Sequence, residues 1–325
     1  MIKIKIGKRY SKRVISSFLE RSKDLYPEYK MIYKKDFILV KNKKKISKKE
    51  INSLNNTLDI IERLEEKKIY YKSNKKIIFK KDPLPYLEKK NEIKRIDEGL
   101  FQFHGVFLKI FRKLDLYFYN LATKKYNGID QENPILWPID LFKKINYFSE
   151  FPQQILLVSA LKKNSRNYKK FADKHSIDKR FSSIKIDTSF ENSKFGLQPA
   201  VCDNCYYALS NLKKFKNTVY TTFNKVFRNE LSQNNSLDRL ISFSVRDIMF
   251  VGNKKFVKNI RDKLLGELKN FFKMSGLNFS IEIANDPFFI GKINKNVFQQ
   301  SHELKYEIIV KIPFLKKNIA VGSIN

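Results

Sequence analysis

The sequence predicts an α+β fold in which an antiparallel sheet is flanked by helices. Two runs rich in Val, Ile, Phe, Tyr and Thr, residues 218–229 and 239–251, enclose a polar loop at residues 231–238. This pattern is typical of an antiparallel hairpin with a long, mobile tip. Apolar residues at helical spacing predict one long helix within residues 92–126 and a second over residues 256–272.

The first 90 residues are expected to form a small, basic α+β appendage. Apolar spacing predicts its elements as a strand at residues 1–6, a helix at 11–25, a strand at 31–41 and a helix at 47–64. Ser47 and Glu50 are spaced as a capping box for that last helix. Residues 82–85 are typical of a linker. The lysine runs 41–49 and 67–81 indicate solvated faces, with contact to RNA as the alternative.

The stretch 92–126 carries an aromatic stripe, which is more often a packed core or a dimer interface than a cofactor site. His104 falls inside this predicted helix and is interpreted as a core or surface histidine. The lysine-rich residues 161–180 are interpreted as a surface insertion. Gly276 is expected to end the second helix. Alternation predicts two more strands, at residues 278–283 and 304–312.

Composition bounds the class of protein. The 325 residues, 42% of them hydrophobic, suffice for two domains, or for one large domain with an appendage. The 66 Lys and Arg against 33 Asp and Glu give a formal net charge of +33. Such a charge attracts polyanions, either nucleic acid or an acidic carrier protein. The alternative is compositional, because Lys, Asn, Ile, Tyr and Phe are all abundant, as in the products of an AT-rich genome.

The beginning of the chain is charged and lacks the apolar run of a secretory leader. No run of about 18 apolar residues suggests a membrane span. The two cysteines, three positions apart, do not form the framework of a disulfide-rich secreted protein. We therefore expect a reduced, cytoplasmic protein that does not contact a membrane.

The predicted hairpin collects side chains that suit a nucleotide. Because side chains alternate along a strand, Arg228 and Glu230 should share one face. Arg239, Phe243 and Asp247 should share a face on the returning strand. Arginine binds phosphate oxygens, a carboxylate accepts from an exocyclic amine, and a Phe ring stacks on a base.

The pattern Phe227-Arg228-x-Glu230, loop, Arg239-x-x-x-Phe243 resembles motif 2 of class II aminoacyl-tRNA synthetases. The wider order is closer to one branch, the amino acid:[carrier protein] ligases, which resemble archaeal-type zinc-dependent seryl-tRNA synthetases. That order, from about residue 95 to the end, is carried by residues 151–152, 197–202, 245–248, 284–289 and 320–325. The resemblance implies a class II synthetase-like catalytic domain at residues 91–325 and a homodimer formed through the long helix.

The resemblance also implies a metal site. In the carrier-protein ligases the Cys after Pro-Ala is a zinc ligand, and a motif 2 carboxylate is the second; these positions are Cys202 and Asp247. The family has Glu where this chain has Asp247. Thiolate and carboxylate both suit Zn²⁺. The third ligand of the family lies in motif 3, for which Cys205 is a substitute to be considered; otherwise Cys202 is a small buried hydrophobe.

The implied reaction is ATP-dependent activation of a small amino acid, glycine or alanine, as an aminoacyl-adenylate. A carrier-protein phosphopantetheine thiol then takes the aminoacyl group. By carry-over from the family, Arg228 grips the α-phosphate and Arg239 approaches the outer phosphates. Glu230 reads the adenine amine or the substrate end, and Phe243 stacks on adenine. Mg²⁺ would bridge the phosphates, and Zn²⁺ would hold the amino group.

The chain ends at Asn325, before the position of motif 3, so the catalytic domain is expected to be C-terminally incomplete. Two other functions stay open. One is charging of tRNA, with the basic N-terminal residues as the tRNA-binding part. The other is a catalytically silent paralogue that binds RNA or protein, because fold alone does not fix function.

Overall fold

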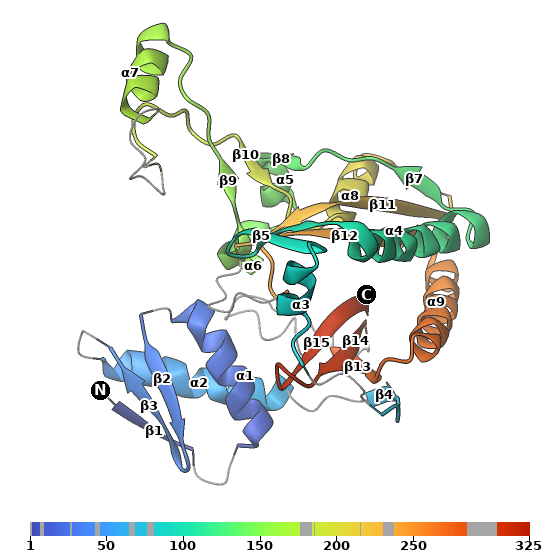
Figure 1. The fold of residues 1–325 in the computed structure, drawn as a ribbon, viewed down its shortest axis with the longest axis horizontal. Coiled ribbons are helices and arrows are strands. Elements are labelled where there is room, and N and C mark those ends of the chain that lie inside the picture. Colours follow the sequence, from blue (N-terminus) through green and yellow to red (C-terminus); the bar gives the residue numbers. More distant parts are fainter. Residues whose placement is uncertain are drawn as a thin grey trace. The chain divides into compact units, whose positions relative to one another are not determined.

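The computed structural model describes residues 2–6, 10–26, 28–42, 46–64, 69–76, 81–175, 184, 186–214, 216–229, 237–284 and 304–325. Figure 1 draws the chain as a ribbon coloured along the sequence. Contacts between residues divide the chain into two units. The first contains Met1–Pro83 and Lys258–Asn325, and the second contains Leu84–Val257. The boundary expected at residue 90 remains a prediction.

The N-terminal part of the first unit has two helices on a three-stranded antiparallel sheet. Its elements are β1 (Ile2–Lys5), α1 (Lys12–Leu25), β2 (Lys30–Lys34), β3 (Phe37–Lys41) and α2 (Lys48–Leu64), with strand order β1-β3-β2. The single strand expected at residues 31–41 is wrong, because the polar pair Lys35-Asp36 turns the chain and makes two paired strands. Both helices begin where expected, and Ser11 accepts from the Val14 N–H as the N-cap of α1.

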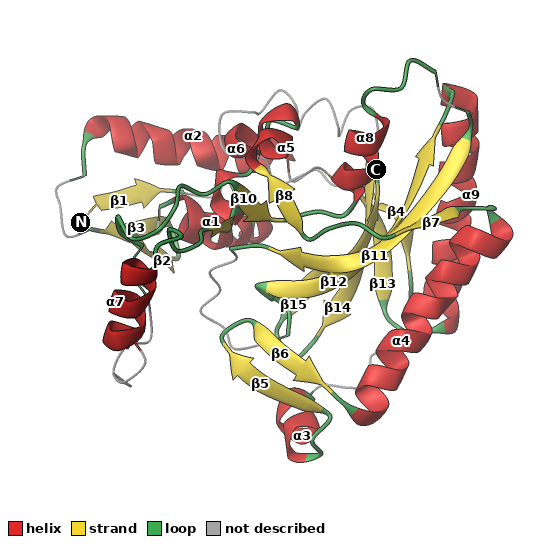
Figure 2. Ribbon diagram, turned by 90° about the horizontal axis from the view of Figure 1, so that it is seen from above, coloured by secondary structure: helices red, strands yellow, loops and turns green. Residues whose placement is uncertain are grey.

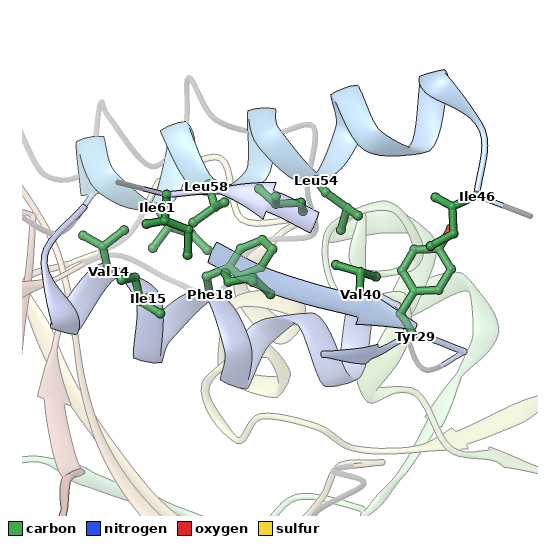
Figure 3. Close-up of a cluster of buried hydrophobic side chains, with 12 residues drawn as sticks. Val14, Ile15, Phe18, Tyr29, Val40, Ile46, Leu54, Leu58 and Ile61 are labelled. Carbon is green, nitrogen blue, oxygen red and sulfur yellow. The ribbon is translucent and has the colours of Figure 1, made fainter. Parts of the chain in front are cut away.

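One apolar cluster holds these five elements together. Phe18 of α1, Val40 of β3 and Leu54 and Leu58 of α2 are fully buried within it (Figure 3). Because side chains of both helices reach the same face of the sheet, that face is closed to solvent. The capping box is confirmed, since the Glu50 N–H donates to the Ser47 hydroxyl at 3.2 Å.

The rest of the first unit is a four-stranded antiparallel sheet packed on a long helix. Its elements are β4 (Ile69–Lys72), α9 (Lys254–Met274, which begins within the second unit), β13 (Phe279–Ala284), β14 (Lys305–Ile312) and β15 (Lys317–Ile324). The strand order is β15-β14-β13-β4, so a strand from the first 90 residues joins a sheet formed by the end of the chain. Leu265 and Phe272 of α9 pack on Phe279 and Ile281.

The second unit carries the hairpin. Its elements are α3 (Leu84–Lys89), β5 (Ile93–Asp97), β6 (Leu100–Phe103), α4 (Gly105–Asn120), a π-helical turn (Leu121–Lys125), β7 (Ile129–Gln131), β8 (Leu136–Pro138), α5 (Ile139–Lys144), α6 (Tyr147–Glu150), a 3-10 turn (Pro152–Gln154), β9 (Leu157–Val158), α7 (Ser165–His175), β10 (Phe195–Leu197), α8 (Cys202–Leu209), β11 (Thr218–Phe227) and β12 (Ser242–Val251). Figure 2 shows β7 alongside the β11–β12 hairpin, where it pairs in parallel with β11.

The helix expected across residues 92–126 is partly wrong. Residues up to Phe103 form the hairpin β5–β6, and α4 begins only at Gly105, with His104 as its extended N-cap residue. Gly99 explains the difference, because its φ of 66° turns the chain between the two strands. The linker expected at residues 82–85 is also shortened, since α3 starts at Leu84.

The α+β class is confirmed. Among the described residues every strand pair is antiparallel except that of β7 with β11. Of the helices described, none combines the length and the apolar character needed to cross a bilayer.

Candidate active site

The β11–β12 hairpin presents two different faces. In its register Thr222 lies opposite Asp247, and Phe223 lies opposite Arg246. Because successive side chains of a strand point to opposite faces, Arg246 and Asp247 serve different sides of the hairpin. The strands are shorter than expected at the loop end, so Arg228 follows β11, and Arg239 precedes β12.

On one face, Arg246 fastens the hairpin to α4. Its Nε and a terminal nitrogen donate to the two carboxylate oxygens of Asp115, the second at 3.1 Å. Its guanidinium also lies over the rings of Tyr119 and Phe223, with centroid distances of 5.1 and 5.5 Å. A third donor reaches the Thr221 hydroxyl at 3.2 Å, so this arginine is held on several sides.

On the other face, Asp247 meets the start of α8. Its carboxylate accepts hydrogen bonds from both the backbone N–H and the thiol of Cys202. The Thr221 hydroxyl donates to the Asp247 carbonyl at 2.8 Å, which fixes the strand at this residue. The two residues expected to be metal ligands, 45 positions apart in the sequence, are therefore in direct contact.

Burial and like charge shape the electrostatics around this pair. Burial raises the pKa of Asp247, although the Cys202 hydrogen bonds and Arg228 oppose that shift. Burial and then the Asp247 charge raise the pKa of Asp203 to about 6. Burial followed by the charges of Asp203 and Asp247 raises the pKa of the Cys202 thiol. Without a bound cation, the cluster is therefore protonated more readily than isolated groups.

Cys205 has a different environment. It is one turn further along α8 and completely buried. Burial alone raises the pKa of its thiol to about 11, with no contribution from a carboxylate. Cys205 therefore behaves as a packed core side chain.

At the loop end of the hairpin, Arg228 lies against Phe243. The guanidinium carbon is 5.4 Å from the centroid of the Phe243 ring. The Arg228 Nε donates to the Pro199 carbonyl at 2.9 Å, and its backbone N–H donates to the Ile241 carbonyl at 3.0 Å. The structure thus brings together the arginine and the aromatic ring that were expected to bind a nucleotide.

Gln198 ties the loop before Cys202 to β11. Its side chain is fully buried, and its amide nitrogen donates to the Lys225 carbonyl at 2.5 Å. Its side-chain oxygen accepts from Asn204 of α8 at 2.8 Å, and its backbone carbonyl accepts from the Phe227 N–H at 2.9 Å. The side chain therefore connects strand, loop and helix around the Cys202–Asp247 pair.

Two further segments support the loop end. The Ile241 N–H donates to the Gly99 carbonyl at 3.0 Å, so the β5–β6 turn lies against the start of β12. The Asn229 N–H donates to the Gln154 carbonyl at 3.1 Å, two residues after the Phe151-Pro152 dipeptide singled out in the sequence. Motifs far apart in the sequence thus converge where the hairpin ends.

The remaining expected site residues are placed differently. Arg239 is exposed and precedes β12, so the alternation of the strand does not direct it to the face of Phe243. Glu230 and most of the expected polar loop lie outside the described residues. Asp203, Gln198 and Asp115 were not assigned from the sequence. Their roles depend on contacts between distant segments, and no pattern in the sequence indicates such contacts.

The structure brings together two of the three ligand positions that the resemblance implies for a zinc site. Cys202 and Asp247 offer a sulfur and an oxygen donor in contact, and these donors suit Zn²⁺. Among the residues that the structure describes, no three His, Cys, Asp or Glu side chains are grouped for a metal ion. The pair therefore offers donors for two of the ligand positions that the resemblance implies.

Comparison with known proteins finds several that are similar in sequence to this chain. No protein-family model matches the chain. The type-2 serine–tRNA ligases of Methanococcus maripaludis strain S2 and Methanocaldococcus jannaschii are each 25% identical over 264 residues, covering 78% of this chain and 51% of their own. The chain thus spans about half the length of these curated relatives. Amino acid–[acyl-carrier-protein] ligase 1 of Bradyrhizobium diazoefficiens is 32% identical over 101 residues, 30% of each chain.

Solved structures show the same fold. The M. kandleri SerRS, in complex with A. aeolicus tRNASec, matches 99% of this chain and 66% of its own, with a TM-score of 0.68 and 15% identity. The cytoplasmic serine–tRNA ligase of Naegleria fowleri, in complex with AMP, matches 85% and 64%, with a TM-score of 0.57 and 13% identity. Together with the motif order, these similarities show that the chain is similar to class II aminoacyl-tRNA synthetases and has the fold of that class.

Proposed function

We propose that the chain binds ATP at the loop end of the β11–β12 hairpin and activates a small amino acid, glycine or alanine, as its adenylate. We further propose that the phosphopantetheine thiol of a carrier protein attacks the aminoacyl carbonyl of the adenylate, forming a thioester and releasing AMP. The observation that carries the proposal is the seating of Arg228 against Phe243, with its Nε held by the Pro199 carbonyl. A fixed cation beside an aromatic ring suits a phosphate attached to a base.

In the proposed first step, a carboxylate oxygen of the amino acid attacks the α-phosphorus of ATP. The bond from that phosphorus to pyrophosphate breaks, leaving aminoacyl-adenylate. Arg228 holds the α-phosphate oxygens as charge develops on them, and Phe243 orients the adenine. Arg239 and Glu230 are proposed for the outer phosphates and the adenine amine. Mg²⁺ would neutralise the phosphates, and Zn²⁺ on Cys202 and Asp247 would bind the amino group.

Amino-acid-dependent exchange of pyrophosphate into ATP tests the activation step. Arg228→Ala should lower the exchange rate by about 10²- to 10³-fold, the usual loss when a transition-state donor is removed. Arg166→Ala, on exposed α7, is the matched control and should leave the rate unchanged. Folded protein that shows no exchange with glycine, alanine or serine would contradict the activation step and favour the silent paralogue.

Metal analysis tests the zinc site independently of activity. Elemental mass spectrometry of protein purified without chelator should find about one zinc per chain. Cys202→Ala and Asp247→Ala should each abolish the zinc content, because each removes a ligand. Cys205→Ala should keep the metal, because its buried thiol is held apart from the carboxylates. Retention of zinc in Cys202→Ala would refute the assignment.

Transfer to tRNA is the second candidate for the acceptor step. The similarity to type-2 serine–tRNA ligases extends over 78% of this chain, whereas the carrier-protein ligase matches 30% of it. Enzyme preloaded with radiolabelled amino acid and ATP can be offered either holo carrier protein or tRNA. A thioester that hydroxylamine cleaves on the carrier supports the first acceptor. An ester on the tRNA 3′ end supports the second.

We propose that α4 forms a homodimer interface. Val106, Ile110 and Leu114 lie four residues apart along it and are 59%, 53% and 43% exposed. Residues at that spacing form one continuous apolar stripe on a helix. Light scattering after gel filtration should give twice the 38.6 kDa chain mass, and Ile110→Asp should give the monomer. Leu212→Asp, also at an exposed apolar position, should remain dimeric. A monomeric wild-type protein would contradict the interface.

The proposed zinc site also needs a reduced Cys202 thiol, and both cysteines are free thiols in the structure. We therefore propose the cytoplasm as the site of action, in agreement with the expectation from cysteine usage.

A further inference from the structure

A pocket lies where the edge strand β4 meets the end of α9, within the first unit. β4 pairs with β13 at the edge of the four-stranded sheet (Figure 2). The pocket has a volume of about 450 Å³, within the range of about 300–1,000 Å³ that small-molecule sites occupy. The described residues that line it are polar or aromatic and include no acid; they are Tyr71, Ser73, Asn74, Lys75 and Lys273.

Two lysines of α9 converge on the ring of Tyr71. The Lys269 Nζ lies 4.8 Å from the ring centroid, and the Lys273 Nζ lies 5.2 Å from it. The two lysines are four positions apart and share one side of the helix, where like charges repel each other. Among the residues that the structure describes, neither lysine forms an ion pair with a carboxylate that would offset this repulsion.

The loop that follows β4 is fixed against the start of β13. The Ser73 N–H donates to the Phe279 carbonyl at 2.8 Å. The Asn278 side-chain amide donates to the Lys75 carbonyl at 2.6 Å. The Ser73 side chain is buried, and its hydroxyl accepts from the Lys75 N–H at 3.2 Å. Lys75 therefore extends from a backbone whose position is set before any ligand binds, which lowers the entropic cost of binding.

This arrangement suits a ligand that carries several negative charges. Lysine ammonium groups bind phosphate oxygens as point charges. Three of them, on Lys75, Lys269 and Lys273, match a diphosphate group better than they match a single carboxylate. The Tyr71 ring packs on Phe279 and is covered by the two ammonium groups of α9, so it is not available to stack on a base. Recognition should therefore depend on the phosphate groups and not on a base attached to them.

We propose that this pocket binds the diphosphate group of a small molecule, either inorganic pyrophosphate or a nucleoside diphosphate. The bound oxygens would lie about 2.8 Å from the ammonium nitrogens and would remove the repulsion between Lys269 and Lys273. The residues of the pocket belong to the first unit, whereas Arg228 and Phe243 belong to the second. The proposal is therefore independent of the proposed reaction.

Isothermal titration calorimetry of the full chain with inorganic pyrophosphate tests the proposal. Arg228→Ala serves as the parent protein, so that the proposed ATP site contributes less to the signal. Lys269→Gln/Lys273→Gln in this parent should weaken binding at least about 10-fold, because each substitution removes a charged hydrogen bond. Lys254→Gln/Lys258→Gln removes the same charge at the same spacing from exposed positions of α9, and it should change Kd less than about twofold.

A single substitution on the loop gives a second, milder test. Lys75→Gln lies at an exposed position outside the helix and should weaken pyrophosphate binding at least about 3-fold, because one of the three cations is lost. Circular dichroism confirms that each variant is folded.

Adenosine and guanosine 5′-diphosphate distinguish the two sources of the diphosphate group. Equal affinity for pyrophosphate and both nucleotides would show that the inorganic anion is sufficient. A similar gain in affinity for both nucleotides over pyrophosphate would assign the pocket to nucleoside diphosphates. A gain for one nucleotide alone would contradict recognition through the phosphate groups.

Three further results would overturn the proposal. One is an absence of pyrophosphate binding by both the parent and the wild-type chain. Another is equal weakening by the two double variants, which would assign binding to the overall charge of the chain. The last is an RNA that loses affinity in Lys269→Gln/Lys273→Gln while pyrophosphate does not compete with it.

Discussion

Arg246 forms a two-pronged ion pair with Asp115, joining β12 to α4, and the next residue of β12 is Asp247, which faces Cys202. One strand therefore positions two different elements. Its Arg246 side holds the helix with the exposed apolar stripe, and its Asp247 side holds the candidate metal pair. Any change that shifts β12 relative to α4 is expected to disturb both.

Asp115→Ala is predicted to lower the free energy of unfolding by about 3 kcal/mol, because it removes the carboxylate that accepts two hydrogen bonds from Arg246 and leaves only the Asp130 carboxylate, 3.9 Å away and half exposed. The Arg246 side chain is only 10% exposed, so water cannot replace the lost carboxylate fully. Asp140→Ala removes an acid whose ion pair with Lys143 is solvated on both sides, and it should cost less than about 0.5 kcal/mol. Urea denaturation measures both. Equal losses in the two variants would contradict the structural role of the pair.

Gln198→Met is predicted to lower the free energy of unfolding by about 1–3 kcal/mol, since the Lys225 carbonyl and the Asn204 amide would lose their buried partner. The volume of the side chain is nearly kept, so the loss reports on hydrogen bonding rather than on packing. Gln102→Met, at an exposed position of β6, should change stability by less than about 0.5 kcal/mol. Chemical denaturation of the wild type and the two variants measures these free energies. An unchanged stability of Gln198→Met would show that the hydrogen bonds of Gln198 do not stabilise the fold.

The sequence predicted the parts of the fold that local patterns control. The hairpin, the capping box at Ser47 and the helix ended by Gly276 all follow from alternation, spacing or a positive φ, and all are present. The expectation failed where one short turn interrupts an apolar run. The turn at Gly99 makes residues 93–103 a hairpin where a helix was expected. The turn at Lys35-Asp36 makes two paired strands where one strand was expected.

In the candidate site, too, some residues could be predicted from the sequence and others could not. The positions of Cys202, Asp247, Arg228 and Phe243 came from an ordered resemblance, and the structure brings them together in two contacting pairs. Asp203 could not be singled out in this way. Its burial beside Asp247 depends on α8 packing against β12, and Asp247 lies 44 positions further along the chain, so a single sequence does not indicate that contact.

Glu50 is predicted to make the N-terminal part of the chain less stable in acid. Hydrogen bonds from Ser47 and Tyr29 lower the pKa of Glu50 to about 2 in the folded state. A carboxyl with a depressed folded pKa contributes stability that is complete above its unfolded value of about 4.3 and is lost as the pH falls towards 2. The free-energy difference between the wild-type chain and Glu50→Gln, from urea denaturation, should therefore shrink across that window. A difference that is constant with pH would contradict the assignment.

Gly99→Ala is predicted to destabilise the loop end of the hairpin by at least about 1–2 kcal/mol. The residue has a φ of 66°, and an added Cβ would lie 2.9 Å from the Ile241 backbone nitrogen, whose N–H bonds the Gly99 carbonyl. Gly266→Ala in α9 is the opposite case, because among the described residues no atom outside the surrounding helix backbone lies within 4 Å of the new Cβ. It should stabilise the helix by about 0.5–1 kcal/mol. Thermal and urea unfolding of both variants test these two predictions. An unchanged stability of Gly99→Ala would mean that the β5–β6 turn does not support β12.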